Sequence, residues 1–201
     1  MSDKYLDDDE LAMLAGLFRD SADRTDVPLM IAMDASLRAL LEKASALELR
    51  MELNNQVLHF PVQLPAQLNE AQLTAPLITS DGLHPRAWRL PAPEGLSLVY
   101  RNGKRVAADI QDLSVNGMRL LSRRCLFAHR ATRNVLMKLN TELTIPLSMT
   151  LVRQHRGNQF WLTSVTFELA VAERLVLSEF VFRGFIRELN KTTKQPDEAA
   201  S

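Results

Sequence analysis

Two short polar segments hold the side chains best suited to recognising an anion. The first contains Arg86 and Arg89, and the second contains Asp112, Ser114 and Gly117. Guanidinium groups pair bidentately with phosphate or with guanine O6 and N7, and they stack on purine faces. A serine hydroxyl can donate to a phosphate oxygen, and glycine permits positive φ or a close approach of backbone to ligand. Because such residues are also common in turns, the second segment is typical of a plain turn as well.

Patterns of the common enzyme classes are absent from the chain. There is no Gly-rich loop with a phosphate-binding lysine and no Gly-x-Ser-x-Gly elbow. Cys125 follows two arginines, which can activate a thiol, although a lone buried cysteine is the commoner outcome. The histidines have no cysteine or carboxylate at metal-ligand spacing and are expected on surfaces and loops: His59, His84, His129 and His155. We therefore expect no catalysis and no metal.

The first part of the chain combines two periodicities. Apolar residues recur at helical spacing over residues 11–18 and again over residues 28–44. The period then changes to two over residues 47–53, and a turn leads into a second strand over residues 57–62. A turn signal at residues 80–82 closes this part.

The second part reads as a series of short strands followed by one helix. Asn102-Gly103 is the strongest hairpin signal in the chain, and strands at such spacing indicate an antiparallel barrel or sandwich. A broad apolar face predicts a helix over residues 170–190 that packs against the barrel. The predicted strands are residues 96–100, 105–110, 118–121, 136–145, 147–153 and 160–167.

Charge divides the chain at the same place as the turn signal. Residues 1–81 carry a formal charge of −8 and residues 82–201 carry +8, although the whole chain is neutral. We place a domain boundary there, with an acidic domain at residues 1–82 and a basic domain at residues 83–201. The basic domain suits an anionic partner, and mutual attraction of the two halves explains the asymmetry equally well.

The order of these features resembles the PilZ domain, a bacterial receptor module for cyclic di-GMP. The family pattern is an R-x-x-x-R loop, about two strands, and then [D/N]-x-S-x-x-G. The second motif is matched by Asp112, Ser114 and Gly117, and Arg89 aligns with the second arginine of the first motif. Arg86 stands one residue later than the first arginine of the pattern. The resemblance covers about residues 83–190.

The resemblance implies a mainly β fold with flanking helices: a six-stranded antiparallel PilZ-like barrel with a C-terminal helix. A small α+β domain precedes it, an order similar to that of flagellar-brake PilZ proteins. It implies a cyclic di-GMP receptor that acts through an unidentified protein partner, in motility or surface attachment. Asp112 would accept from a guanine and Ser114 would donate to a phosphate. The implied ligand-binding residues are Arg86, Arg89, Asp112, Ser114 and Gly117.

Two other classes of function remain open from the sequence. One is a degenerate PilZ adaptor that binds a protein partner without nucleotide. The other is a barrel that binds single-stranded nucleic acid, which the 12 aromatic residues disfavour because most occupy core-like alternating positions. We expect cyclic di-GMP as the ligand, no nucleic acid, and a monomer or homodimer. The acidic N-terminal residues, the single cysteine and the lack of a ~20-residue apolar stretch favour a cytoplasmic protein without a membrane span.

Overall fold

The structure is a computed structural model of the 201-residue chain. The chain divides into two compact units. The first consists of Met1–Trp88 and Phe182–Ser201, and the second consists of Arg89–Val181. The chain therefore passes from the first unit to the second between Trp88 and Arg89. The residues that the structure describes are 27–29, 41, 43–53, 55–64, 71–128, 130–140 and 143–193.

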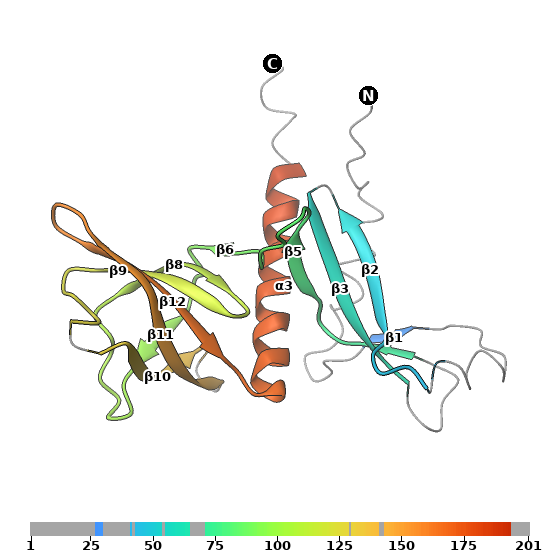
Figure 1. Ribbon diagram of the computed structural model, residues 1–201, viewed down its shortest axis with the longest axis horizontal. Coiled ribbons are helices and arrows are strands. Elements are labelled where there is room, and N and C mark those ends of the chain that lie inside the picture. Colours follow the sequence, from blue (N-terminus) through green and yellow to red (C-terminus); the bar gives the residue numbers. More distant parts are fainter. Residues whose placement is uncertain are drawn as a thin grey trace, which may run out of the picture. The chain divides into compact units, whose positions relative to one another are not determined.

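The first unit contains a five-stranded antiparallel sheet (Figure 1). Its path is β1-β4-β3-β2, and β5 pairs with β3 along residues 56–59. The predicted strands at residues 47–53 and 57–62 are confirmed as β2 and β3. The strands are β1 (Val27–Leu29), β2 (Glu48–Leu53), β3 (Gln56–Gln63), β4 (Ala71–Leu73) and β5 (Leu77–Ser80).

The predicted helix over residues 28–44 is wrong at its start. Pro28 lies in β1, opposite Gln72 of β4. Proline lacks a backbone N–H and is tolerated in an edge strand, and β1 ends the path of its sheet. Most of that expected helix, and the whole of the one at residues 11–18, lie outside the described residues.

The core of the first unit combines the sheet with the end of the C-terminal helix. Phe60 of β3 meets Phe182 edge to face, with ring centroids 6.0 Å apart. Trp88 packs in the same way on Phe185, at 5.1 Å, so its indole serves this core. The buried members of the cluster are Leu53, Leu58, Phe60, Leu73, Ile78, Phe182, Phe185 and Ile186.

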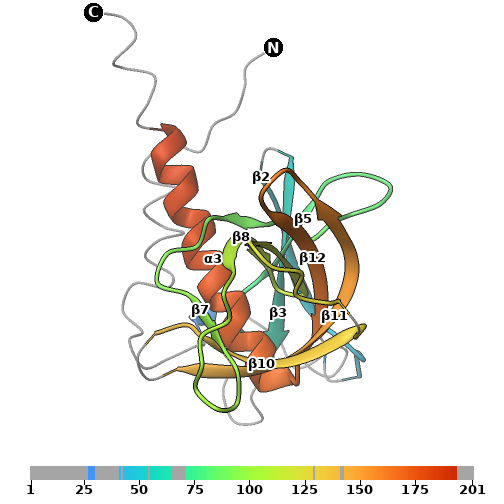
Figure 2. The same cartoon turned by 90° about the vertical axis from the view of Figure 1, so that its left-hand side faces the viewer.

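The second unit is a curled antiparallel sheet of seven strands, in the order β6-β8-β9-β12-β11-β10-β7 (Figure 2). This confirms the mainly β fold with antiparallel strands. The two-residue β6 is a strand beyond the six expected. The strands are β6 (Leu90–Pro91), β7 (Ser97–Val99), β8 (Asp109–Ser114), β9 (Gly117–Ser122), β10 (Thr132–Lys138), β11 (Thr144–Arg156) and β12 (Trp161–Glu168).

The Asn102-Gly103 hairpin forms, but its second arm differs from the prediction. Gly103 has φ 79°, and the Tyr100 N–H donates to the Lys104 carbonyl at 2.8 Å. Pairing along this arm ends at the buried Val106, whose N–H donates to the Leu98 carbonyl. The chain then enters β8 only at Asp109. The strand expected at residues 105–110 therefore lies at residues 109–114 instead.

Pro146 does not break its strand. β11 runs through it from Thr144 to Arg156, whereas two strands were expected around it. Pro146 lies opposite Leu136 of β10, and the pairing of β11 with β12 begins only at Ser148. At Pro146 the strand therefore has a neighbour on one side, where a missing N–H is tolerated.

The predicted C-terminal helix is confirmed as α3 (Val171–Thr193). Glu173 in its first turn and Lys191 in its last turn have the signs that the helix dipole favours. Residues up to Val181 belong to the second unit and those from Phe182 belong to the first. No helix in the described part of the chain is both long and apolar enough to cross a membrane.

Candidate functional site

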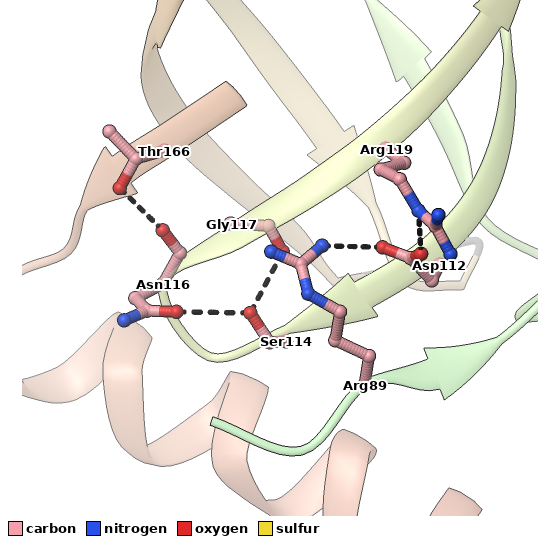
Figure 3. Close-up of polar contacts among 7 residues, drawn as sticks. All are labelled: Arg89, Asp112, Ser114, Asn116, Gly117, Arg119 and Thr166. Atoms are coloured by element: carbon pink, nitrogen blue, oxygen red, sulfur yellow. Dashed lines mark hydrogen bonds and ion pairs between the residues drawn. The ribbon is translucent and has the colours of Figure 1, made fainter. Parts of the chain in front are cut away.

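Asp112 is the centre of a charged cluster on β8. Its side chain is only 4% exposed, and both of its carboxylate oxygens accept from arginines (Figure 3). Arg89 donates from Nη1 to Oδ1 at 2.5 Å, and Arg119 of β9 donates from Nε to Oδ2. The cluster therefore contains one buried carboxylate and two guanidinium groups, with a formal charge of +1.

The two guanidinium groups are held at the surface rather than buried. The Arg89 side chain is 43% exposed and the Arg119 side chain is 47% exposed. A guanidinium carries five N–H donors in a rigid fork, and each group here donates one N–H to Asp112. The other N–H groups find no acceptor among the described residues, so the cluster presents positioned donors and a positive charge to solvent.

The short connection after Asp112 is closed by Ser114 and Asn116. Ser114 is fully buried, and its hydroxyl lies 3.0 Å from both the Gly117 carbonyl and the Asn116 side-chain oxygen, which share its proton. The Asn116 carbonyl accepts from the Phe167 N–H at 3.0 Å and from the Thr166 hydroxyl at 2.8 Å (Figure 3). These contacts fix the β8–β9 connection to β12 and account for Ser114 as a turn residue.

Gly117 is required for a close approach between strands, not for positive φ. It pairs with Thr166 of β12, and a Cβ built on it would lie 2.7 Å from the Val165 carbonyl oxygen. The glycines with positive φ in the described residues are Gly82, Gly95 and Gly103. The close approach that the structure shows at Gly117 is to the backbone of β12, and the expected approach of backbone to ligand stays a prediction.

Gly117→Ala is expected to lower the free energy of unfolding by about 1–3 kcal/mol, the cost of overpacking. The neighbouring atom is a backbone oxygen in a paired strand, which cannot rotate away as a side chain would. Urea unfolding followed by circular dichroism measures the change. Gly157→Ala is the matched control, because its Cβ would lie 3.4 Å from the nearest atom, the Phe160 carbonyl oxygen. Equal costs in the two variants would contradict this account of Gly117.

The structure brings together four of the five residues expected at the site: Arg89, Asp112, Ser114 and Gly117. Arg86 belongs to the other compact unit. Its backbone is tied to Ser80: its N–H donates to Ser80 Oγ at 3.0 Å, and its carbonyl accepts from the Ser80 N–H at 2.8 Å. Its side chain is exposed.

Asn116 is a site residue that the sequence reasoning missed, and Arg119 is one that the sequence offers as a substitute cation but favours as solvated surface charge. In an antiparallel hairpin, the length of the turn decides which residues face each other. The two-residue turn after Ser114 pairs it with Gly117, and regular pairing from there sets Asp112 opposite Arg119; the irregularity in the register comes only beyond this pair. Counting outward from this turn along both strands is the signal that identifies Arg119 as the partner of Asp112.

The histidines and the cysteine form no metal site in the part of the chain that the structure describes. His59 contacts Glu48 Oε1 at 2.7 Å and Thr79 Oγ1 at 3.3 Å. His84 and His155 are exposed, and His129 lies outside the described residues. Cys125 is partly buried, and its Sγ accepts from Gln154 Nε2 at 2.8 Å.

A curled antiparallel sheet, a D-x-S-x-x-G turn between two of its strands and a C-terminal helix together describe a PilZ-like β-barrel. The chain resembles the PilZ family in its motifs, and the solved structures similar to it include complexes of other proteins with cyclic di-GMP. No family model and no curated protein matches the chain.

Three of the similar structures illustrate the range. MrkH of K. pneumonia in its apo state has a TM-score of 0.42 and 14% identity, covering 83% of this chain and 79% of MrkH. YcgR from Escherichia coli, in complex with cyclic di-GMP, has a TM-score of 0.43 and 15% identity, covering 85% and 78%. The Bacillus subtilis inhibitor of motility MotI has a TM-score of 0.39 and 11% identity, covering 85% and 87%.

Proposed function

We propose that the chain is a non-enzymatic receptor for cyclic di-GMP. The observation that carries the proposal is the Asp112 cluster, in which a buried carboxylate holds two half-exposed guanidinium groups beside a D-x-S-x-x-G turn. Cyclic di-GMP offers two phosphates and two guanines. Guanidinium groups bind both kinds of group through bidentate hydrogen bonds and stack on the bases. The chemistry of the cluster therefore matches that of the ligand.

The charge around the cluster supports an anionic ligand. Residues 113–168, which include β9 to β12, contain eight arginines and lysines but only two acidic residues, Glu142 and Glu168. A surface with such an excess raises the local concentration of anions and speeds their association. Because exposed charges are screened by salt, we expect nucleotide affinity to fall as ionic strength rises.

Within this proposal the five residues have distinct roles. Arg89 binds a phosphate or a guanine with the N–H groups that Asp112 leaves unused. Asp112 accepts from a guanine through the second lone pairs of its oxygens and also holds Arg89. Ser114 and Gly117 shape the turn, and the Ser114 hydroxyl donates to a phosphate when it rotates away from the oxygens of Asn116 and Gly117 that it contacts here. Arg86 adds a second cation to the loop before β6.

The output of the receptor is a change in how it binds a protein partner, in motility or surface attachment. Arg89 immediately follows Trp88, and the division between the two units runs between these residues. Ligand held by Arg89 therefore acts on the segment that joins the units. Ordering of a connecting segment by a ligand is a known switching mechanism. We place this action in the cytoplasm.

Isothermal titration of the whole chain with cyclic di-GMP tests the proposal. The wild type is expected to bind, and Arg89→Met is expected to bind roughly 10- to 100-fold more weakly, the scale of one good bidentate contact. Arg101→Met is the matched control because it removes the same charge from an exposed turn position. The absence of heat from the wild type at millimolar ligand would overturn the receptor proposal.

The alternative is a degenerate PilZ adaptor that binds protein alone, and one observation favours it. Arg86 and Arg89 are one residue closer than the family pattern requires, and Pro85 occupies the position of the missing arginine. Pro85→Arg restores the spacing and releases the fixed φ of proline. Binding by Pro85→Arg without binding by the wild type would identify the native chain as the adaptor.

A further inference from the structure

Arg119 occupies a defined position on the outer face of the curled sheet. It lies on β9 between Met118 and Leu120, both fully buried. Because side chains alternate along a strand, Arg119 points away from the core, as its 47% exposure shows. It faces Asp112 of β8 on one side and Ser164 of β12 on the other.

The contact with Asp112 uses only the Nε N–H of Arg119 and leaves the N–H groups of both Nη atoms unused. Arg119 donates to Asp112 through Nε (Figure 3). Its two Nη atoms find no acceptor among the described residues and can offer paired N–H groups to one anion. Paired N–H groups on a planar guanidinium are the geometry that binds phosphate bidentately.

The need to neutralise Asp112 does not by itself explain why Arg119 lies beside it. One cation balances one carboxylate, and Arg89 already donates to Asp112 at 2.5 Å. The second guanidinium gives the cluster its net positive charge at the surface. A surface that holds two guanidinium groups on one buried carboxylate is arranged for an additional anion.

We infer that Arg119 is the second arginine of the ligand site and binds a phosphate of cyclic di-GMP beside Arg89. This inference rests on the proposed function and adds a binding residue outside both sequence motifs. Asp112 is then a positioning residue for both guanidinium groups. The shortened spacing of Arg86 and Arg89 matters less in this arrangement, because the second cation comes from β9.

Titration of Arg119→Met with cyclic di-GMP tests the inference. We expect affinity to fall roughly 10- to 100-fold and the remaining binding to depend less on salt, because one charge pair is lost. The melting temperature should remain close to that of the wild type, since Asp112 keeps Arg89. Arg119→Lys retains the charge without the fork and should bind with intermediate affinity. Arg101→Met, the exposed control, should bind as the wild type does.

The outcomes separate this inference from the proposed function. If the wild type binds and Arg119→Met binds equally well with the same salt dependence, Arg119 has no role in the ligand and the inference is overturned, while the receptor proposal stands. If Arg119→Met fails to fold, Arg119→Lys decides, because wild-type affinity in that variant would overturn bidentate binding. If the wild type does not bind, both proposals fail together.

Discussion

Simultaneous loss of Arg89 and Arg119 is expected to lower the free energy of unfolding by about 3–5 kcal/mol, the cost of leaving a buried charge without a partner. Asp112 is 4% exposed and would have no cation in the Arg89→Met/Arg119→Met variant. Each single variant retains one ion pair and should cost only about 1 kcal/mol, because each guanidinium is about half exposed. Urea unfolding of the four proteins in the double-mutant cycle measures the coupling between the arginines.

A third substitution distinguishes loss of charge pairing from loss of packing. Adding Asp112→Asn to the double variant removes the buried charge with little change in side-chain shape. Since replacing all members of a buried ion cluster is far less costly than removing one side of it, stability should recover in part. A double variant that costs no more than the sum of the single variants would show that Asp112 reaches water when its partners are removed.

The outline of the basic half could be predicted from the sequence because its signals are local. Asn102-Gly103 fixes a tight turn through positive φ at Gly103, and α3 follows from a continuous helical period. The D-x-S-x-x-G segment was open to two interpretations, as a turn and as a site. The structure shows the turn contacts of Ser114 directly, and they are compatible with a site at Asp112.

The pairing of distant residues could not be predicted from local signals. Nothing near Gly117 in the sequence indicates that the Val165 carbonyl would crowd its Cβ, since that contact depends on β12. The pairing of Asp112 with Arg119, by contrast, follows from the short turn, because the β8–β9 register is regular from Ser114 and Gly117 up to this pair. The residue type alone does not reveal this role, because a guanidinium in the middle of a strand is indistinguishable by type from solvated surface charge.

Pro28 and Pro146 show a related limit. Proline favours the first turn of a helix and is also tolerated wherever a strand has no neighbour on its N–H side. Both prolines lie in strands where pairing is seen on one side only among the described residues. The choice between the two interpretations depends on which strands lie alongside, and that information is not present in the residues next to the proline.

The core of the first unit provides the second large effect, since Phe182→Ala is expected to lower the free energy of unfolding by about 3–5 kcal/mol. Phe182 is 1% exposed and its ring meets Phe60 edge to face, so truncation removes buried apolar surface and leaves a cavity. Phe160→Ala is the matched control, because Phe160 is 40% exposed and should cost less than about 1 kcal/mol, as for most surface substitutions. Guanidinium unfolding of both variants makes the comparison. A similar loss at the two positions would mean that Phe182 does not lie in the core, and that the end of α3 contributes little to the stability of the first unit.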